Sequence, residues 1–253
     1  MSLTRAERAR HMRDYVDLQL RFAARLAEAG GLDPAEALLR YTNLHRRLAL
    51  GPPDVDGPHP AWSDFVGRLL TLPDHDARVA CAVAAWAAAG AEPPLPNQQR
   101  FGAFGCNPPD ADGLVRIHFS PDDGDDVSPL AAGKVARRRA ELAALTRHVA
   151  EWQPRARAIR GTSWLYHLDA YRRLFPSAYA QSATLHGPGL SFAGNANWGQ
   201  FVTFRGEFKA EAGARMRANL QRLDPGRPWL AFPLPALTVQ APVDVFLGEF
   251  EAV

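Results

Sequence analysis

The chain has 253 residues, 29 basic and 27 acidic side chains, and a formal net charge of +2. Such a small net charge produces no long-range field that would gather nucleic acid or an anionic membrane surface, so we expect neither as a partner. The two cysteines, Cys81 and Cys106, lack the spacing of a zinc site or a disulfide framework, and no apolar stretch is long enough to span a bilayer. We therefore expect a cytoplasmic protein, and its alanine-rich, arginine-rich composition is typical of a GC-rich bacterial genome.

The first ninety residues have the pattern of helices. Thr4 and Glu7 form a capping box before apolar residues at helical spacing, which predicts a helix over residues 5–29. Asp33, followed by Pro34 in the first turn, gives the start signal of a second helix. The N-terminal part is thus predicted to be all-helical.

Two further helices follow, around residues 62–69 and from Asp74 onward. The segment AEPPLP, residues 91–96, is a stiff proline-rich connector, and the regular helical period is lost beyond it. We therefore expect a helical subdomain over residues 1–92 and a second domain over residues 97–253.

The second domain is predicted to mix strands and helices. LVRIHF, residues 114–119, alternates between apolar and polar side chains as a strand does, and FGAFG before it is a candidate hairpin partner across NPPDADG. Ser128 and Pro129 then give the start signal of a long helix that ends near Trp152. ARAIRGTSWLY, residues 156–166, has the composition of the next strand.

The remaining segments continue this mixture. We predict a helix over residues 168–175, a strand over 199–204, an amphipathic helix over 207–223 and a terminal helix over 243–250. The expected fold class is therefore α+β, with a helical N-terminal part followed by a mixed sheet flanked by helices.

The stretch GTSWLYHL places several reactive side chains at the predicted corner between a strand and a helix. Ser163 in GTSWL resembles the nucleophile of a GxSxG elbow, but Leu165 stands where the second glycine is required. The chain has no histidine after His186, which leaves little choice of a catalytic base downstream. These departures argue against a serine hydrolase, and a hydroxyl that is hydrogen-bonded at the end of a sheet explains Ser163 equally well.

Metal and nucleotide sites find little support in the sequence. DDGDD, residues 122–126, clusters carboxylates but lacks the alternating ligands and the final glutamate of a calcium-binding loop. The eight histidines form no HExxH motif, and AAGKVA lacks the residues of a phosphate-binding GxxxxGK[ST] loop. We expect no metal site and no nucleoside triphosphate site.

His118 lies on the opposite side of its predicted strand from Val115 and Ile117. If this strand is a neighbour of the 156–166 strand, His118 lies near Ser163 or His167 at the end of the sheet. Open sheets bind ligands at such ends. A half-buried histidine with satisfied hydrogen bonds is the alternative interpretation.

The order of these segments resembles a known group. VRIHF, a long helix, RGTSWLYHLDAYRRLFP, a VTF strand and LPALTVQAPVDVFL are similar to segments of little-characterised bacterial acyltransferase-domain proteins related to the GNAT fold. The likeness covers about residues 95–253 and touches six positions: His118, Ser163, Trp164, Leu165, Thr238 and Gln240. It implies a GNAT-like domain, a terminal helix that includes LPALTVQ, and acyl-CoA as the cofactor.

Two departures from that group bear on the implied function. The group has a histidine before Ser-Trp, where this chain has Thr162. The backbone loop that holds the pyrophosphate of coenzyme A in GNAT enzymes is also missing, because QQRFGAFG ends in Phe104 where a glycine or alanine belongs.

Two hypotheses follow for the function. The first is an acyl-CoA-dependent N-acyltransferase in which His118 or His167 deprotonates an amine and Tyr166 protonates the leaving thiolate. Its catalytic candidates are His118, Ser163, Tyr166 and His167, and its substrate-binding candidates are Trp164 and Arg160. The second is a non-catalytic protein that binds a small molecule or acts as a scaffold, with a degenerate GNAT-like domain.

Overall fold

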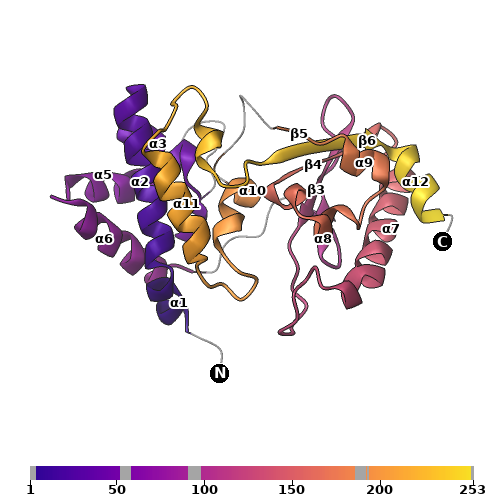
Figure 1. Ribbon diagram of the computed structural model, residues 1–253, viewed down its shortest axis with the longest axis horizontal. Helices are drawn as coiled ribbons and strands as arrows, with labels where there is room; N and C mark the ends of the chain where they lie inside the picture. The colour runs from indigo at the N-terminus through magenta and orange to yellow at the C-terminus, as the bar shows by residue number, and fades with distance from the viewer. Residues whose placement is uncertain (1–3, 52–57, 91–97, 186–191, 193, 252–253) are drawn as a thin grey trace. The chain divides into compact units, whose positions relative to one another are not determined.

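The computed structural model describes residues 4–51, 58–90, 98–185, 192 and 194–251 (Figure 1). The chain divides into two compact units. Unit 1 consists of Met1–Pro94 and Gly187–Pro235, and unit 2 consists of Leu95–His186 and Ala236–Val253. Unit 1 is helical and unit 2 holds a mixed sheet with helices, so the predicted α+β class is confirmed.

The N-terminal segment of unit 1 forms six helices in its described residues: α1 (Arg5–His11), α2 (Arg13–Gly30), α3 (Pro34–Tyr41), α4 (Leu44–Arg47), α5 (Pro60–Thr71) and α6 (His75–Ala88). The predicted start signals are confirmed at Thr4, whose side chain and Glu7 form a capping box, and at Asp33 and Asp74, whose carboxylates accept N–H groups of the first turn. The single helix predicted over 5–29 is wrong in one respect, because Met12 ends α1 and precedes α2.

The second segment of unit 1 also folds as helices and turns: α10 (Asn195–Trp198), η3 (Gly199–Phe201), α11 (Ala210–Leu220) and η4 (Pro228–Ala231). The strand predicted over 199–204 is wrong. Phe201 is fully buried in the core of unit 1, and Val202 makes only an isolated bridge with Phe208. The predicted helix over 207–223 is present as α11 with shorter ends.

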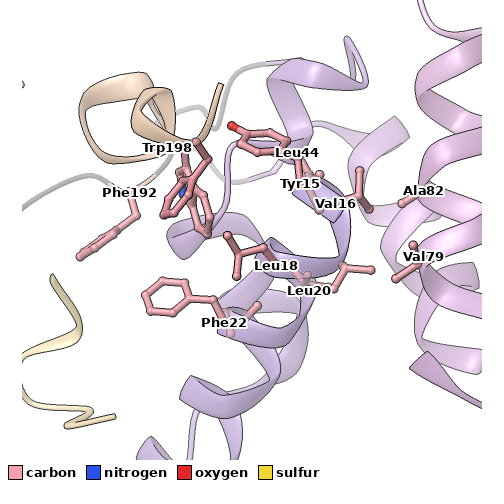
Figure 2. Close-up of a cluster of buried hydrophobic side chains, with 14 of the residues drawn as sticks. Tyr15, Val16, Leu18, Leu20, Phe22, Leu44, Val79, Ala82, Phe192 and Trp198 are labelled. Carbon is pink, nitrogen blue, oxygen red and sulfur yellow. The ribbon is translucent and has the colours of Figure 1, made fainter. Parts of the chain in front are cut away.

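Aromatic side chains join the two segments of unit 1. Figure 2 shows Trp198 and Phe192 against the side of α2 that carries Phe22, while Val79 and Ala82 lie on its other side. The ring of Trp198 lies 5.7 Å from that of Phe22 and 6.1 Å from that of Tyr15. Since these rings bury large apolar areas, Phe192 and the described residues from Gly194 to Phe232 share one core with the N-terminal helices. The sequence predicts a continuous second domain over residues 97–253, whereas the structure assigns Gly187–Pro235 to unit 1.

A buried polar network reinforces the same junction. The Asn43 side chain donates to the Tyr15 hydroxyl at 2.9 Å and to Asn195 Oδ1 at 3.0 Å, and its backbone N–H donates to Gln19 Oε1 at 2.8 Å. Tyr15, Gln19 and Asn43 are at most 1% exposed. The bonds from Asn43 to Tyr15 and Gln19 are buried and the bond to Asn195 is partly buried, so the network fixes the geometry around the start of α4.

Unit 2 contains a six-stranded mixed sheet in the order β1-β2-β3-β4-β6-β5. The strands are β1 (Gln99–Phe101), β2 (Phe104–Cys106), β3 (Leu114–Phe119), β4 (Ala158–Ser163), β5 (Thr184–Leu185) and β6 (Leu237–Pro242). β3 and β4 are parallel, and the other neighbouring strands are antiparallel. The predicted adjacency of the two main strands and the predicted hairpin partner of β3 are both present.

The helices of unit 2 depart from prediction mainly at their ends. They are η1 (Ala132–Lys134), α7 (Val135–Trp152), η2 (Trp164–His167), α8 (Asp169–Arg172), α9 (Ser177–Gln181) and α12 (Val243–Glu251). The long helix does not begin at Ser128, whose carbonyl only accepts the Ala131 N–H in a turn. LTVQAP forms β6 rather than part of a terminal helix, and α12 follows it directly, as the helical spacing from Val243 predicts.

The two faces of the sheet differ in character. On the apolar face, Val115, Ile117, Ile159 and Val239 form one buried cluster with side chains of α7, α8, α9 and α12. The alternate strand residues form what we call the polar face: Arg116, His118, Arg160, Thr162, Thr238 and Gln240. No helix in the described part of the chain combines the length and the apolar character needed to cross a membrane.

Candidate ligand-binding site

The parallel ladder between β3 and β4 ends before the strands do. Its last registered pair within the described chain is Arg116 with Arg160, although each strand continues for three more residues. The outer edge of β3 is occupied by β2 as far as Phe119, and that of β4 by β6 as far as Ser163. The facing stretches 118–119 and 162–163, which we call the unpaired edges, therefore carry backbone groups that do not bond each other in a ladder.

The polar face borders these unpaired edges. Arg116, Arg160 and Gln240 stand side by side on β3, β4 and β6, and Arg160 Nε donates to Gln240 Oε1 at 3.0 Å. One row further along, the hydroxyls of Thr162 and Thr238 are 3.0 Å apart. The sequence marks Thr162 only as a departure from the acyltransferase-domain group, and alternation along β4 puts it on the same face as Arg160.

His118 lies on the polar face, two residues beyond Arg116. Its Nε2 makes a short contact with Asn107 Oδ1, and the backbone N–H of Asn107 donates to the Arg116 carbonyl at 3.0 Å. An amide oxygen can only accept, so Nε2 carries the hydrogen in this contact. Asn107 thereby orients the imidazole, a role for which the sequence offers no signal.

A shallow hollow with a volume of about 460 Å³ adjoins this contact. It is lined by Gln98, Gln99, Cys106, Asn107, Pro108, His148 and Gln153. Burial raises the pKa of the Cys106 thiol to about 11, so the thiol stays protonated and is a poor nucleophile at neutral pH. Amide groups and an imidazole dominate the lining, which suits an uncharged polar ligand group.

Ser163 does not share the face of His118. It pairs in register with Leu237, whose side chain packs against the apolar core of unit 2. The Leu165 N–H donates to Ser163 Oγ at 3.1 Å, so the hydroxyl caps η2. The structure therefore supports the structural interpretation of Ser163 and does not bring it to the imidazole as a nucleophile.

Tyr166 also lies on the apolar face and is 1% exposed. Its hydroxyl is 2.8 Å from that of Tyr179, and both hydroxyls press against Gly161. Burial, followed by the neighbouring Tyr179, raises the pKa of Tyr166 well above its ordinary value. A covered hydroxyl of this kind has no access to a leaving thiolate, so the predicted proton-donor role does not fit this geometry.

The other predicted residues occupy the border of the site. His167 is exposed at the end of η2, and Trp164 is half-buried at its start. Arg160 is half-buried on the polar face. Of the six candidates, the structure thus brings His118 and Arg160 to one face, and places Ser163 and Tyr166 on the other.

The acidic loop 122–126 is held by cations of the chain itself. Asp123 contacts the buried guanidinium of Arg138 and lies 2.8 Å from Lys134 Nζ and 3.3 Å from Arg137. The hydrogen bond from Arg138, then that from Lys134, lowers the pKa of Asp123 to about 2. Within the described residues no group of three or more His, Cys, Asp or Glu side chains is placed to hold a metal ion.

QQRFGAFG, the segment closest to a pyrophosphate loop, forms the β1–β2 hairpin instead. Gly102 at its turn has φ 61°, a conformation that favours glycine, and Glu141 packs against it. The Glu141 carboxylate accepts the Ala103 N–H at 3.1 Å. This segment therefore builds the sheet edge and supplies no cradle of amides for phosphate.

No family model, curated protein or solved structure matches this chain. The site consists of a polar sheet face with two adjacent arginines, an oriented histidine, and a parallel ladder that ends early.

Proposed function

We propose that unit 2 binds an acyl-CoA along the unpaired edges of β3 and β4 and transfers the acyl group to an amine. The observation that carries this proposal is the early end of the β3–β4 ladder at Arg116 and Arg160. Strand edges with unpaired N–H and C=O groups bind extended ligands that bring amide groups of their own. The pantetheine arm of coenzyme A is such a ligand, since it is extended, carries amides and ends in the reactive sulfur.

His118 is the base in this proposal. Its ring lies beside one unpaired edge and is oriented by Asn107. The amine nitrogen attacks the thioester carbonyl and gives up a proton to the imidazole; the carbon–sulfur bond then breaks, and the thiolate of coenzyme A takes up a proton. The mixed sheet flanked by helices is the architecture that the GNAT-like resemblance implies, which further supports the proposal.

Calorimetric titration with acetyl-CoA and longer acyl-CoAs tests binding, and release of free thiol in the presence of an amine panel tests transfer. We expect His118→Gln to lower kcat by roughly 10²–10⁴-fold, the range for loss of a general base, with little change in the affinity for acyl-CoA. His11→Gln is the matched control, because His11 is exposed and belongs to unit 1. Absence of heat with every acyl-CoA at millimolar concentration would refute the proposal.

A second candidate is a binding protein without catalytic activity. It is favoured by the structural use of Ser163 and Tyr166 and by the charges near the start of α7. There Lys134, Arg137 and Arg138 are paired with Asp123, Asp125 and Glu141, which leaves no excess positive charge for the phosphates of coenzyme A. Native mass spectrometry of protein purified from its own host separates the two, since a retained ligand together with zero turnover supports the binding protein.

A further inference from the structure

We infer that Arg116 and Arg160 together bind an oxyanion, the phosphate or carboxylate group of a small ligand, on the polar face of the sheet. The inference goes beyond acyl transfer and does not depend on it. A protein that only binds a ligand would use the pair in the same way.

The two arginines are direct neighbours on adjacent parallel strands. Like charges placed directly opposite each other destabilise a sheet, so an anion bound between them would make this arrangement more favourable. Neither guanidinium forms an ion pair with any described residue, and only Arg160 makes a side-chain hydrogen bond, through Nε to Gln240. The remaining N–H donors of both forks are available to a ligand.

The surroundings of the pair have the same sign of charge. The six strands contain three arginines, Arg100, Arg116 and Arg160, together with His118 and no acidic residue. Arg100 shares the face of His118, because the register pairs Arg100 with Gly105 and Gly105 with His118, and its guanidinium donates to the carbonyl of Ser120 at 2.7 Å. Arg116 and Arg160 are the two cations of this face that stand directly opposite each other in a ladder.

An oxyanion matches the geometry of this pair. Neighbouring strands lie about 4.8 Å apart, so the forks of two opposite arginines can converge on one phosphate or carboxylate. Guanidinium groups bind such planar or tetrahedral oxyanions through paired N–H bonds. His118 stands about 7 Å further along β3, so a ligand anchored by its anion would place its next polar atoms beside the imidazole.

A small anion fits better than a nucleic acid. The basic residues at the start of α7, Lys134, Arg137 and Arg138, are paired with carboxylates of the same unit. The formal net charge of the whole chain is only +2. A polyanion would require a continuous row of unpaired cations along its backbone, whereas this face offers two adjacent ones.

Titration of the full chain with inorganic phosphate tests the inference. We would follow the side-chain Nε–Hε signals of the arginines by NMR, with ionic strength held constant by sodium chloride. We expect the signals of Arg116 and Arg160 to shift with saturation, and each of Arg116→Gln and Arg160→Gln to weaken the affinity by roughly tenfold to a hundredfold, as the loss of a charge-assisted contact does. Arg147→Gln, which removes an exposed arginine of α7, is the matched control and should leave the affinity unchanged.

Arg116→Lys adds a second measurement, since it keeps the charge but lacks the fork; we expect an affinity between those of the wild type and Arg116→Gln. Equal affinities for phosphate in the wild type and in the three glutamine variants would overturn the inference. The inference would also be overturned if a single-stranded oligonucleotide bound far more tightly than phosphate and if Arg147→Gln weakened that binding as much as Arg116→Gln does. That result would indicate a surface for polyanions. Phosphate bound at the pair, with no binding of acetyl-CoA, would leave this inference standing and refute the acyltransferase.

Discussion

His45 makes the stability of unit 1 depend on pH. Its side chain is 1% exposed, its ring lies edge-on to Trp62 with centroids 5.9 Å apart, and neither ring nitrogen has a hydrogen-bond partner among the described residues. Burial, with a smaller contribution from Arg46, lowers the pKa of His45 from 6.5 to about 4. The folded protein therefore holds this imidazole neutral at pH values where the unfolded chain protonates it.

The sign and size of the effect follow from linkage. Below pH 6.5 the unfolded state binds more protons than the folded state, so stability falls as the pH falls toward 4 and this group has no further effect below that. Each pH unit within this window costs about 1.4 kcal/mol. At pH 5 the expected loss relative to pH 7.5 is roughly 2 kcal/mol.

Guanidinium denaturation at pH 7.5 and 5.0 measures this loss. Tryptophan fluorescence reports mainly on unit 1, which contains Trp62, Trp86, Trp198 and Trp229 of the chain's six tryptophans. We expect His45→Phe, which keeps a ring against Trp62, to remove about 2 kcal/mol of the difference between the two pH values. The exposed His11→Gln should keep the full difference. An equal acid-induced loss in both variants would refute the reasoning.

Three further predictions concern unit 2. Asp123→Asn should lower the free energy of unfolding by about 1–3 kcal/mol at pH 7, because it leaves the buried guanidinium of Arg138 with Glu141 as its remaining carboxylate. Since the pKa of Asp123 is held at about 2, the wild type should lose this contribution only as the pH falls from about 4 toward 2. Urea midpoints measured across that pH range would show the loss. Gly161→Ala should destabilise the folded protein by about 1–3 kcal/mol in thermal unfolding, because the new methyl group would lie 1.9 Å from the Tyr166 hydroxyl. The control is Gly248→Ala in α12, where the new methyl group meets no atom within 4 Å; this substitution should be neutral or stabilising. Arg116→Gln should raise the free energy of unfolding in phosphate-free, low-salt buffer by about 0.2–1 kcal/mol through relief of like-charge repulsion, and a decrease would show that Arg116 stabilises the sheet by itself.

Local signals predict much of the helical structure correctly. α6 begins where Asp74 accepts the Ala77 N–H at 2.8 Å, and α11 follows its apolar stripe, because a cap and a stripe act within a few residues of chain. The strand predicted over 199–204 fails because a short apolar run fits a buried turn as well as a strand. What decided between them was the distant aromatic cluster around Phe22, which no local pattern reveals.

The sheet shows the same division between local and distant causes. LTVQAP alternates inward and outward through Val239 and Ala241, so the strand β6 had a visible period of two that the resemblance to a terminal helix obscured. Its place between β4 and β5 could not be predicted, because β5 is only two residues long and lies more than fifty residues upstream. The discontinuous unit 1 is likewise set by packing between segments far apart in sequence.

The candidate site depended on a register that the sequence does not contain. A helix between two strands indicates parallel neighbours, so the adjacency of the strands that carry His118 and Ser163 could be predicted. A shift of one residue exchanges the faces of a strand, however, and the observed pairing of Ser163 with Leu237 directs the serine to the apolar side. The hydroxyls that share the face of His118 belong to Thr162 and Thr238.

This placement gives weight to one of the departures from the acyltransferase-domain group. Thr162 stands where that group has a histidine, and here its hydroxyl is engaged with Thr238 at 3.0 Å on the polar face. A histidine at this position would add a second titratable group on the same face as His118, next to the unpaired edges. If the proposed transfer takes place on this face, exchanging Thr162 would act on the chemistry beside His118, whereas exchanging the serine that caps η2 would act first on stability. Position 162 is therefore the position at which the proposed transfer and simple binding would diverge on this sheet.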